Sequence, residues 1–220
     1  MYGVIKLHSQ LIISWEFMRI TEFHNEGFYH IYNRGVDKQD IFLDIYDYQR
    51  MMDTLLIKND STTTIKHGFR KSEIKKIILQ EPYVKIHAFC LMTNHFHLLV
   101  EQKKQGGVSD YLQRVGNSYT KYFNAKYKRT GHIFESTFKD RIIESEKYLC
   151  HLSRYIHSNP HKYCKLKNKF DYIKHYKWSS LRHYLGLEKI KIVDDSIIRK
   201  YFQNIDEYEQ YIFDYLFGQH

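Results

Sequence analysis

Residues 83–101 read YVKIHAFCLMTNHFHLLVE, and this stretch decides the fold. Two runs rich in β-branched and aromatic residues are separated only by Thr93 and Asn94, which is the pattern of a β-hairpin. In the second run His95 and His97 alternate with apolar residues, so both imidazoles point to one face of the strand. The sequence therefore predicts a hairpin that carries a pair of histidines on one side.

The segments around this hairpin complete a β-α-β-β-α-β order, which is that of the split βαβ, ferredoxin-like arrangement. We therefore expect an α+β fold, with a helix after the last strand of the sheet and a helical C-terminal extension. The expected elements are a strand at 28–32 that enters a turn, a helix at 46–57, a short inserted helix at 72–79, the hairpin, a helix at 108–127, a strand at 133–144 and a helix at 145–159 that Pro160 stops.

Length and composition indicate one globular domain with additions at both ends. The chain has 220 residues, of which 43% are hydrophobic, and it has no apolar run long enough to span a membrane. We divide it into an N-terminal extension (1–22), a main domain (23–185) and a helical C-terminal extension (186–220). Three cysteines without a CxxC pair argue against a disulfide scaffold or a zinc ribbon, and they suit a reducing cytoplasm.

The positive charge is concentrated in the middle of the chain. The formal net charge is +9, and residues 101–180 carry 17 basic and 7 acidic side chains, a net +10. Such a region attracts a polyphosphate, above all a nucleic acid, through the release of counterions. A charged surface that only keeps the protein soluble is the alternative.

The two hairpin histidines form a candidate metal site, because two imidazoles on one side of a β-ribbon hold a divalent cation. The chain has 14 histidines, so composition alone predicts about one His-x-His pair. Two solvent-facing or core-packed histidines are therefore the alternative.

The helix expected at 145–159 carries the second candidate group. Leu149, Leu152 and Ile156 define its buried stripe, and Tyr155 and Asn159 lie one turn apart on the flank of that stripe. A phenol and an amide at these positions face a site on the sheet. The alternative is a buried tyrosine and an asparagine that ends the helix.

Four blocks of sequence, taken in order, resemble one family over about residues 23–185. The resemblance is to the single-tyrosine transposases of the HUH superfamily, in particular the REP-associated tyrosine transposases. An insertion near residues 58–80 and Thr93, where many relatives have proline, depart from the family pattern. The blocks are YHIYNRG (29–35), MTNHFHLLV (92–100), RYIHSNP (154–160) and KWSS (177–180).

The resemblance implies an enzyme that nicks and rejoins single-stranded, hairpin-flanked DNA through a 5′-phosphotyrosine. Tyr155 is then the nucleophile, and His95, His97 and Asn159 are the ligands of Mg²⁺ or Mn²⁺. The relatives act as monomers or homodimers, and both states stay open for this chain. A DNA-binding protein on the same fold that no longer transposes is the alternative function.

The basic residues suggest where DNA is bound. Arg34 is a candidate because the Asn-Arg-Gly turn of the family lies near the bound DNA. The other candidates lie on or after the helix at 108–127 and on the strand that follows it: Arg114, Lys121, Lys126, Lys128, Arg129, Lys139 and Arg141. A solvated charged face is the alternative for each of these seven.

Overall fold

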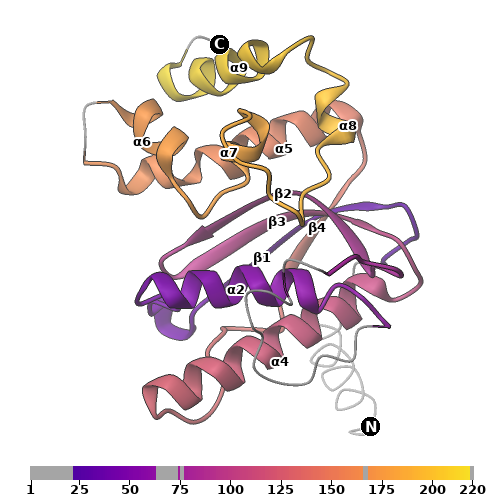
Figure 1. The fold of residues 1–220 in the computed structure, drawn as a ribbon, viewed down its shortest axis with the longest axis vertical. Helices are drawn as coiled ribbons and strands as arrows, with labels where there is room; N and C mark the ends of the chain where they lie inside the picture. Colours follow the sequence, from indigo (N-terminus) through magenta and orange to yellow (C-terminus); the bar gives the residue numbers. More distant parts are fainter. Residues whose placement is uncertain (1–21, 63–73, 75–76, 166–167, 219–220) are drawn as a thin grey trace, which may run out of the picture.

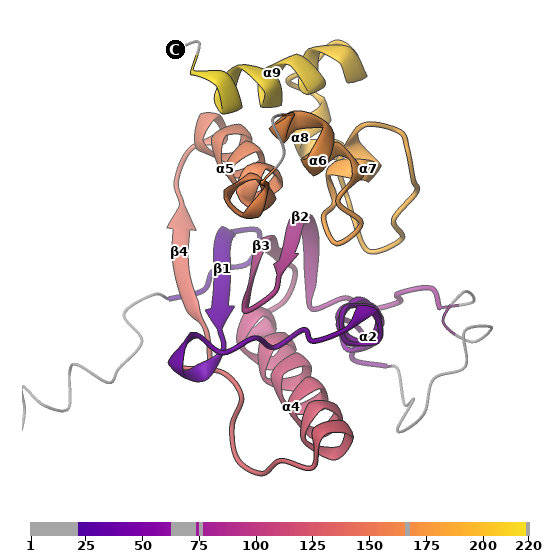
Figure 2. The same ribbon diagram turned by 90° about the vertical axis from the view of Figure 1, so that its left-hand side faces the viewer.

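The sheet is built around the predicted hairpin. We describe residues 22–62, 74, 77–165 and 168–218 from a computed structural model. The strands are antiparallel in the order β2-β3-β1-β4 (Figure 2), which is the ferredoxin-like order, so the predicted fold is confirmed. The strands are β1 (Phe28–Arg34), β2 (Val84–Met92), β3 (His95–Gln102) and β4 (Lys139–Ile143).

Helices cover both faces of the sheet (Figure 1). The helices α2 (Ile45–Ile57) and α4 (Gly107–Tyr127) lie on one face, and α5 (Glu146–Ser158) lies on the other. β3 divides its side chains between these layers as the alternation predicts, because Phe96 and Leu98 belong to the core under α2 and α4, whereas Leu99 belongs to the core under α5. The face that carries Leu99 is also the face of His95 and His97.

The helix predicted at 145–159 is present as α5, and it ends at Ser158, just before Pro160, as predicted. The helix begins after Ser145, whose side chain accepts a hydrogen bond from the amide of Tyr148, as an N-cap does. After Ser158 the chain continues as a 3-10 helix, Asn159–Tyr163. Pro160 lies in the first turn of this 3-10 helix, where its missing N–H costs no hydrogen bond.

The strand predicted at 133–144 is shorter than expected, because only Lys139–Ile143 pairs with β1. The residues before it are bonded to the end of β1 in another way. The Asn33 side chain donates to the carbonyls of Ser136 (2.8 Å) and Thr137 (2.9 Å), and the amide of Glu135 donates to the carbonyl of Arg34 (2.9 Å). These bonds use backbone groups that a ladder needs, so segment 132–138 is irregular. Of the helix predicted at 72–79, residues 72, 73, 75 and 76 lie outside the described residues, Ile74 is helical, and 77–79 are not.

In the C-terminal part α6, α7 and α8 lie beside α5, and α9 lies over α5 as a second layer (Figure 1, Figure 2). The helical extension expected at 186–220 is present as α8 and α9, which share one apolar core with α5. Residues 1–21 lie outside the described part, and the division at 185/186 stays a prediction. Among the described helices, none combines the length and the apolar character that a membrane crossing needs. The helices after α5 are α6 (Lys169–His175), α7 (Leu181–Tyr184), α8 (Ser196–Arg199) and α9 (Ile205–Phe217).

A buried histidine connects α5 to this second layer. His157 is fully buried, and its two ring nitrogens are 2.7 Å from the Tyr208 hydroxyl on α9 and 2.6 Å from the Ser180 hydroxyl before α7. The Tyr208 hydroxyl also donates to Ser153 on α5 (3.1 Å). Burial lowers the pKa of His157 to about 3. The imidazole is therefore neutral at pH 7 and acts as a structural bridge.

We predict that this histidine makes the protein less stable in acid. The pKa of histidine in an unfolded chain is about 6.5. Between pH 6.5 and the folded pKa of about 3, the unfolded chain binds a proton that folded His157 does not bind. The free energy of unfolding should therefore fall as the pH decreases, by up to ~1.4 kcal/mol per pH unit from this residue. Urea unfolding at pH 7 and pH 5 measures this dependence.

The variant His157→Gln removes the titration while it keeps a polar side chain. It should be less stable than the wild type at pH 7, by about 1–3 kcal/mol for the lost hydrogen bonds. The difference in the free energy of unfolding between the variant and the wild type should be smaller at pH 5 than at pH 7. An equal pH dependence in both proteins would show that His157 does not contribute to it.

Candidate functional site

The predicted histidine pair lies on the α5 face of β3. The ring centroids of His95 and His97 are 5.1 Å apart, and the rings are nearly perpendicular at 88°. In the β1–β3 register, Arg34 is opposite His95 and Tyr32 is opposite His97. His97 is buried and His95 is partly exposed, so the pair lies at the edge of the core.

The tautomer of His95 is fixed by its neighbour. Nδ1 of His95 is 2.7 Å from Oδ1 of Asn94, and the amide nitrogen of Asn94 donates to the carbonyl of Lys38 (3.0 Å). Since the second bond orients the amide, Oδ1 of Asn94 accepts and Nδ1 of His95 donates. Nε2 of His95 therefore keeps its lone pair.

A third imidazole, which the sequence analysis missed, supports His97. Nε2 of His30 on β1 is 2.9 Å from Nδ1 of His97, so one imidazole donates to the other, and the rings are stacked with centroids 5.1 Å apart. The sequence could have indicated the position of His30, because side chains alternate between the two faces of the sheet along β1. Tyr29 and Ile31 are fully buried in the core under α2 and α4, which places His30 on the face of the pair.

The ring of Tyr155 on α5 lies beside these imidazoles. It makes edge-on contacts with His97 (centroids 5.6 Å apart) and with His30 (6.1 Å). Its hydroxyl makes no hydrogen bond with any residue that the structure describes. The three rings line a hollow of about 540 Å³, whose other walls are Tyr32, Arg141, Tyr148, His151, Leu152, Arg154 and Tyr215.

Asn159 is buried one turn after Tyr155, and its amide is held by two bonds. Nδ2 donates to the carbonyl of Tyr155 (3.0 Å), and Oδ1 accepts from the ammonium of Lys162 (3.3 Å). Lys162, which the sequence analysis also missed, lies 5.2 Å from the centre of the Tyr155 ring. The 3-10 turn after α5 brings this cation back to the amide. The oxygen of Asn159 is thus already oriented toward a positive charge.

The three imidazoles are neutral at pH 7. Burial is the main cause that lowers the pKa of His30 to about 4 and that of His95 to about 4, and it lowers the pKa of His97 well below its usual value. The charge of Lys162 lowers the pKa of His95 and of His97 further. Neutral imidazole is the form that binds a metal ion.

The donor set suits a divalent cation with open positions. His95 offers a lone pair at Nε2, His97 lies next to it, and the amide oxygen of Asn159 already accepts from a cation. Within the described ranges, no group of three or more His, Cys, Asp or Glu has the geometry of a metal site. Two imidazoles and one amide oxygen are only three donors, so an ion bound by them would keep positions for other ligands.

Three of the predicted DNA-binding cations surround this site. Arg34 forms a paired bond with Glu135 (2.8 and 3.1 Å), and both line a hollow of about 440 Å³ with His95 and Lys139. Arg141 lines the hollow of Tyr155. These positions support contacts with a polyanion on both sides of the imidazoles.

The other predicted cations lie on or just after α4, in the layer on the opposite face of the sheet (Figure 1). Arg114 and Lys121 line a basic hollow of about 500 Å³. Lys126 is bonded to the carboxylates of Asp44 (2.8 Å) and Asp47 (2.7 Å). Lys128 ends α4 in a left-handed conformation, and the Arg129 guanidinium is 5.7 Å from the centre of the Phe123 ring. The roles of these five cations stay predictions.

Residues 55–159 match the family described as "Transposase IS200 like". This match confirms the transposase resemblance that the four sequence blocks indicated. The matched residues run from α2 to Asn159 and so contain the histidine pair and Tyr155. The match supports an enzyme of the DNA transposase class.

Two solved structures are similar to this chain. A REP-associated tyrosine transposase bound to a REP hairpin has 16% sequence identity and a TM-score of 0.52, over 81% of this chain and 92% of that chain. This likeness shows the fold. A bacterial tRNA(His) guanylyltransferase-like protein in complex with ATP has 9% identity and a TM-score of 0.39, over 78% of this chain and 77% of that chain, which is too low to indicate a shared fold. No curated protein sequence matches the chain.

We predict that His30 sets the affinity of this site for a divalent ion. With the hydrogen bond to His30 lost, His97 loses the group that holds its ring. Partners of this kind typically change metal affinity by about 10- to 100-fold. His30→Ala should therefore bind Mn²⁺ about 10-fold more weakly, as measured by electron paramagnetic resonance.

Two variants complete this test. His30→Gln keeps a hydrogen-bonding side chain and should recover part of the affinity. His175→Ala removes an exposed histidine on α6 and should leave Mn²⁺ affinity unchanged. Unaltered Mn²⁺ binding in His30→Ala would remove His30 from the site.

Proposed function

We propose that the protein is a metal-dependent transposase that nicks and rejoins single-stranded DNA through a covalent bond to Tyr155. The observation that carries this proposal is the position of the Tyr155 ring, 5.6 Å from His97, in a hollow that both residues line. A phenol that bonds to none of the described residues and lies beside a pair of neutral imidazoles suits a nucleophile that acts on a charged phosphodiester. The match to the IS200-like transposases agrees with this chemistry.

The residues that would hold the metal are His95, His97 and Asn159. When bound, Mg²⁺ or Mn²⁺ would neutralise charge on a non-bridging phosphate oxygen and orient the phosphorus. Imidazole ligands favour Mn²⁺ over Mg²⁺. The ammonium of Lys162 donates to Oδ1 of Asn159. If this oxygen bound the ion instead, the ammonium would be released and could turn toward the phosphate.

Tyr155 supplies the nucleophile. Its oxygen attacks the phosphorus and loses its proton to water, while the bond from phosphorus to the 3′-oxygen breaks. The products are a 5′-phosphotyrosine and a strand that ends in a 3′-OH, so the phosphodiester energy is kept for the joining step. A phenol with a pKa of about 10 is ionised about once in a thousand at pH 7, which corresponds to a cost of roughly 4 kcal/mol. The cation of Lys162, 5.2 Å from the ring centre, stabilises the negative charge that develops.

The substrate that fits this geometry is an unpaired strand. A tyrosine on a helix that packs on a sheet reaches a phosphate only when the neighbouring bases are splayed apart. Arg34, Lys139 and Arg141 lie around the site and suit the phosphates on either side. The structurally similar transposase is bound to a REP hairpin, and we extend this substrate, a hairpin with a single-stranded flank, to the present protein.

The proposed site is complete within one copy of the chain. Tyr155 contacts His97 and His30 of its own chain, and Tyr215 of the C-terminal helix α9 closes the same hollow. No residue of a second copy is needed to bring the phenol to the imidazoles. We therefore infer that the protein acts as a monomer.

Loss of the phenol hydroxyl should abolish the covalent product. Incubation of the wild type with Mn²⁺ and a labelled single-stranded hairpin oligonucleotide should give a protein–DNA adduct that survives denaturation. Tyr155→Phe should give no adduct while DNA binding persists. Tyr148→Phe is the matched control, because this tyrosine lines the same hollow from the same helix. Binding without an adduct in the wild type would favour a DNA-binding protein that no longer transposes.

Removal of an imidazole should separate cleavage from binding. His97→Ala should reduce adduct formation by at least about 100-fold, because a ligand of the ion is lost. DNA affinity should change little, since the cations around the site remain. Equal adduct formation in His97→Ala would remove the histidine pair from the mechanism.

A further inference from the structure

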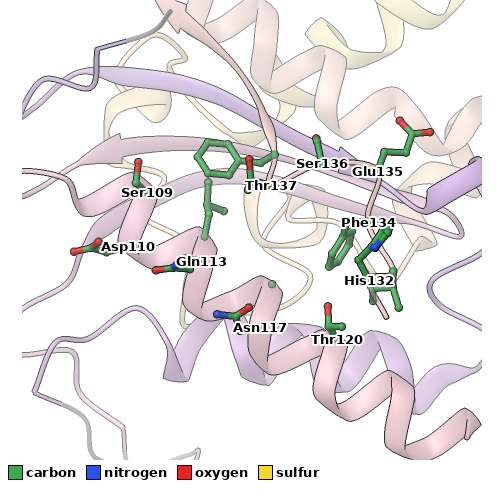
Figure 3. Close-up of a pocket in the computed structure, with 14 residues that line it drawn as sticks. Ser109, Asp110, Gln113, Asn117, Thr120, His132, Phe134, Glu135, Ser136 and Thr137 are labelled. Atoms are coloured by element: carbon green, nitrogen blue, oxygen red, sulfur yellow. The ribbon is translucent and has the colours of Figure 1, made fainter. Parts of the chain in front are cut away.

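A groove of about 680 Å³ lies on the α4 side of the sheet, away from Tyr155. One wall is α4, and the other is the irregular segment that precedes β4 (Figure 3). The bonds from β1 to Glu135, Ser136 and Thr137 fix this second wall. Volumes of this size are typical of ligand sites.

The groove is lined by polar side chains from α4 and by two phenylalanine rings. Gln113, Asn117 and Thr120 follow one another along α4 and line the groove (Figure 3). Their side chains make no hydrogen bond with any other residue of the described part. Phe134 and Phe138, which line the groove and belong to the core, supply aromatic surface. Amides and aromatic rings are the groups that contact the edges and faces of bases.

The charge of the groove argues against a phosphate as its occupant. Among the described residues that line it there is no lysine or arginine, and the acidic ones are Asp110 and Glu135. Uncharged polar ligands are therefore favoured over anions.

The groove shares one lining residue with each of two basic hollows. Glu135 also lines the hollow of His95, Arg34 and Lys139. Asn117 also lines the hollow that contains Arg50, Lys58, Arg114 and Lys121. A strand that passed from the histidine pair over Glu135 and then over Asn117 would meet cations, then the acidic groove, and then cations again.

We propose that this groove binds unpaired bases of the DNA strand whose phosphate is held at the histidine pair. This proposal rests on the proposed function. Gln113 and Asn117 read the base edges. Arg34 and Lys139 on one side, and Arg114 and Lys121 on the other, hold the phosphates before and after these bases.

Gly116 allows the groove to be blocked without damage to the fold. It lines the groove, and a Cβ added to it meets no atom within 4 Å. Leucine is a better helix former than glycine, so Gly116→Leu should fold at least as well as the wild type. Ala125→Leu places the same side chain at an exposed position of α4 outside the groove and is the matched control.

The binding of single-stranded oligonucleotides of mixed sequence tests this proposal. Fluorescence anisotropy should show that Gly116→Leu binds a strand of about 16 nucleotides roughly 10-fold more weakly than the wild type does. The affinity for about 4 nucleotides, which is expected to reach only the histidine pair, should not change. Ala125→Leu should behave as the wild type with both strands.

The salt dependence of binding distinguishes bases from phosphates. Asn117→Ala should weaken binding of the longer strand without a change in the slope of log K against log salt. Lys121→Ala should reduce that slope by about one unit. A reduced slope in Asn117→Ala would mean that a phosphate occupies the groove and would overturn the proposal.

The Tyr155 adduct assay keeps this proposal separate from the proposed function. If the wild type forms the adduct and Gly116→Leu binds the longer strand as tightly as the wild type, the groove is not a base site. If the wild type forms no adduct but Gly116→Leu still loses affinity, the proposed function fails and the groove remains a single-strand binding site.

Discussion

The alternation of side chains along β3 is the constraint on which the rest of the structure depends. Phe96 and Leu98 are buried in the core under α2 and α4, and this fixes the opposite face for His95 and His97. A shift by one residue would place imidazoles in the apolar core and phenylalanine beside Tyr155. Folding and the assembly of the site therefore impose the same requirement on this strand.

The second requirement is a fixed position for α5, because the distance from Tyr155 to the histidines is set by how this helix lies on the sheet. Leu152 and Ile156 pack it against the strands. From the other side, His157 bonds to Tyr208 on α9, so the C-terminal helices hold the catalytic helix from above. Their role in this account is preorganisation, since a nucleophile held by packing on two sides reaches the phosphate at little entropic cost.

The electrostatics of the site follow from its burial. Three neutral imidazoles lie together beneath a phenol, and the cations Lys162, Arg34 and Arg141 lie around them. Burial keeps the imidazoles unprotonated, so they do not add to the surrounding positive charge. A site with neutral ligands at its centre and cations at its rim can accept both a divalent ion and a phosphate.

Sequence periodicity was sufficient for most of the fold, since the hairpin, the helices at 46–57 and 108–127 and the strand order all have strong local signals. The strand at 133–144 was overestimated because its first half bonds to the Asn33 side chain, a partner distant in sequence. Pro160 correctly marked the end of the α-helix, but the 3-10 helix that follows has no clear sequence signal and was not predicted.

In the site, the residues with a local pattern were found and those that depend on tertiary geometry were not. His30 meets His97 only through the pairing of β1 with β3, and Lys162 returns to Asn159 only through the turn after α5. For the same reason, the sequence could not show which basic residues lie near the site and which are bonded to carboxylates elsewhere. Lys126, for example, pairs with Asp47, which is 79 positions away.

The most direct test is anomalous diffraction from crystals of Tyr155→Phe soaked in Mn²⁺. The account predicts one strong manganese peak at the histidine pair, on the side of the ring at position 155 and within coordination distance of Nε2 of His95. A protein that binds Mn²⁺ elsewhere, or that shows no peak at these imidazoles, would contradict the claim that the histidine pair and the phenol converge on a single ion site.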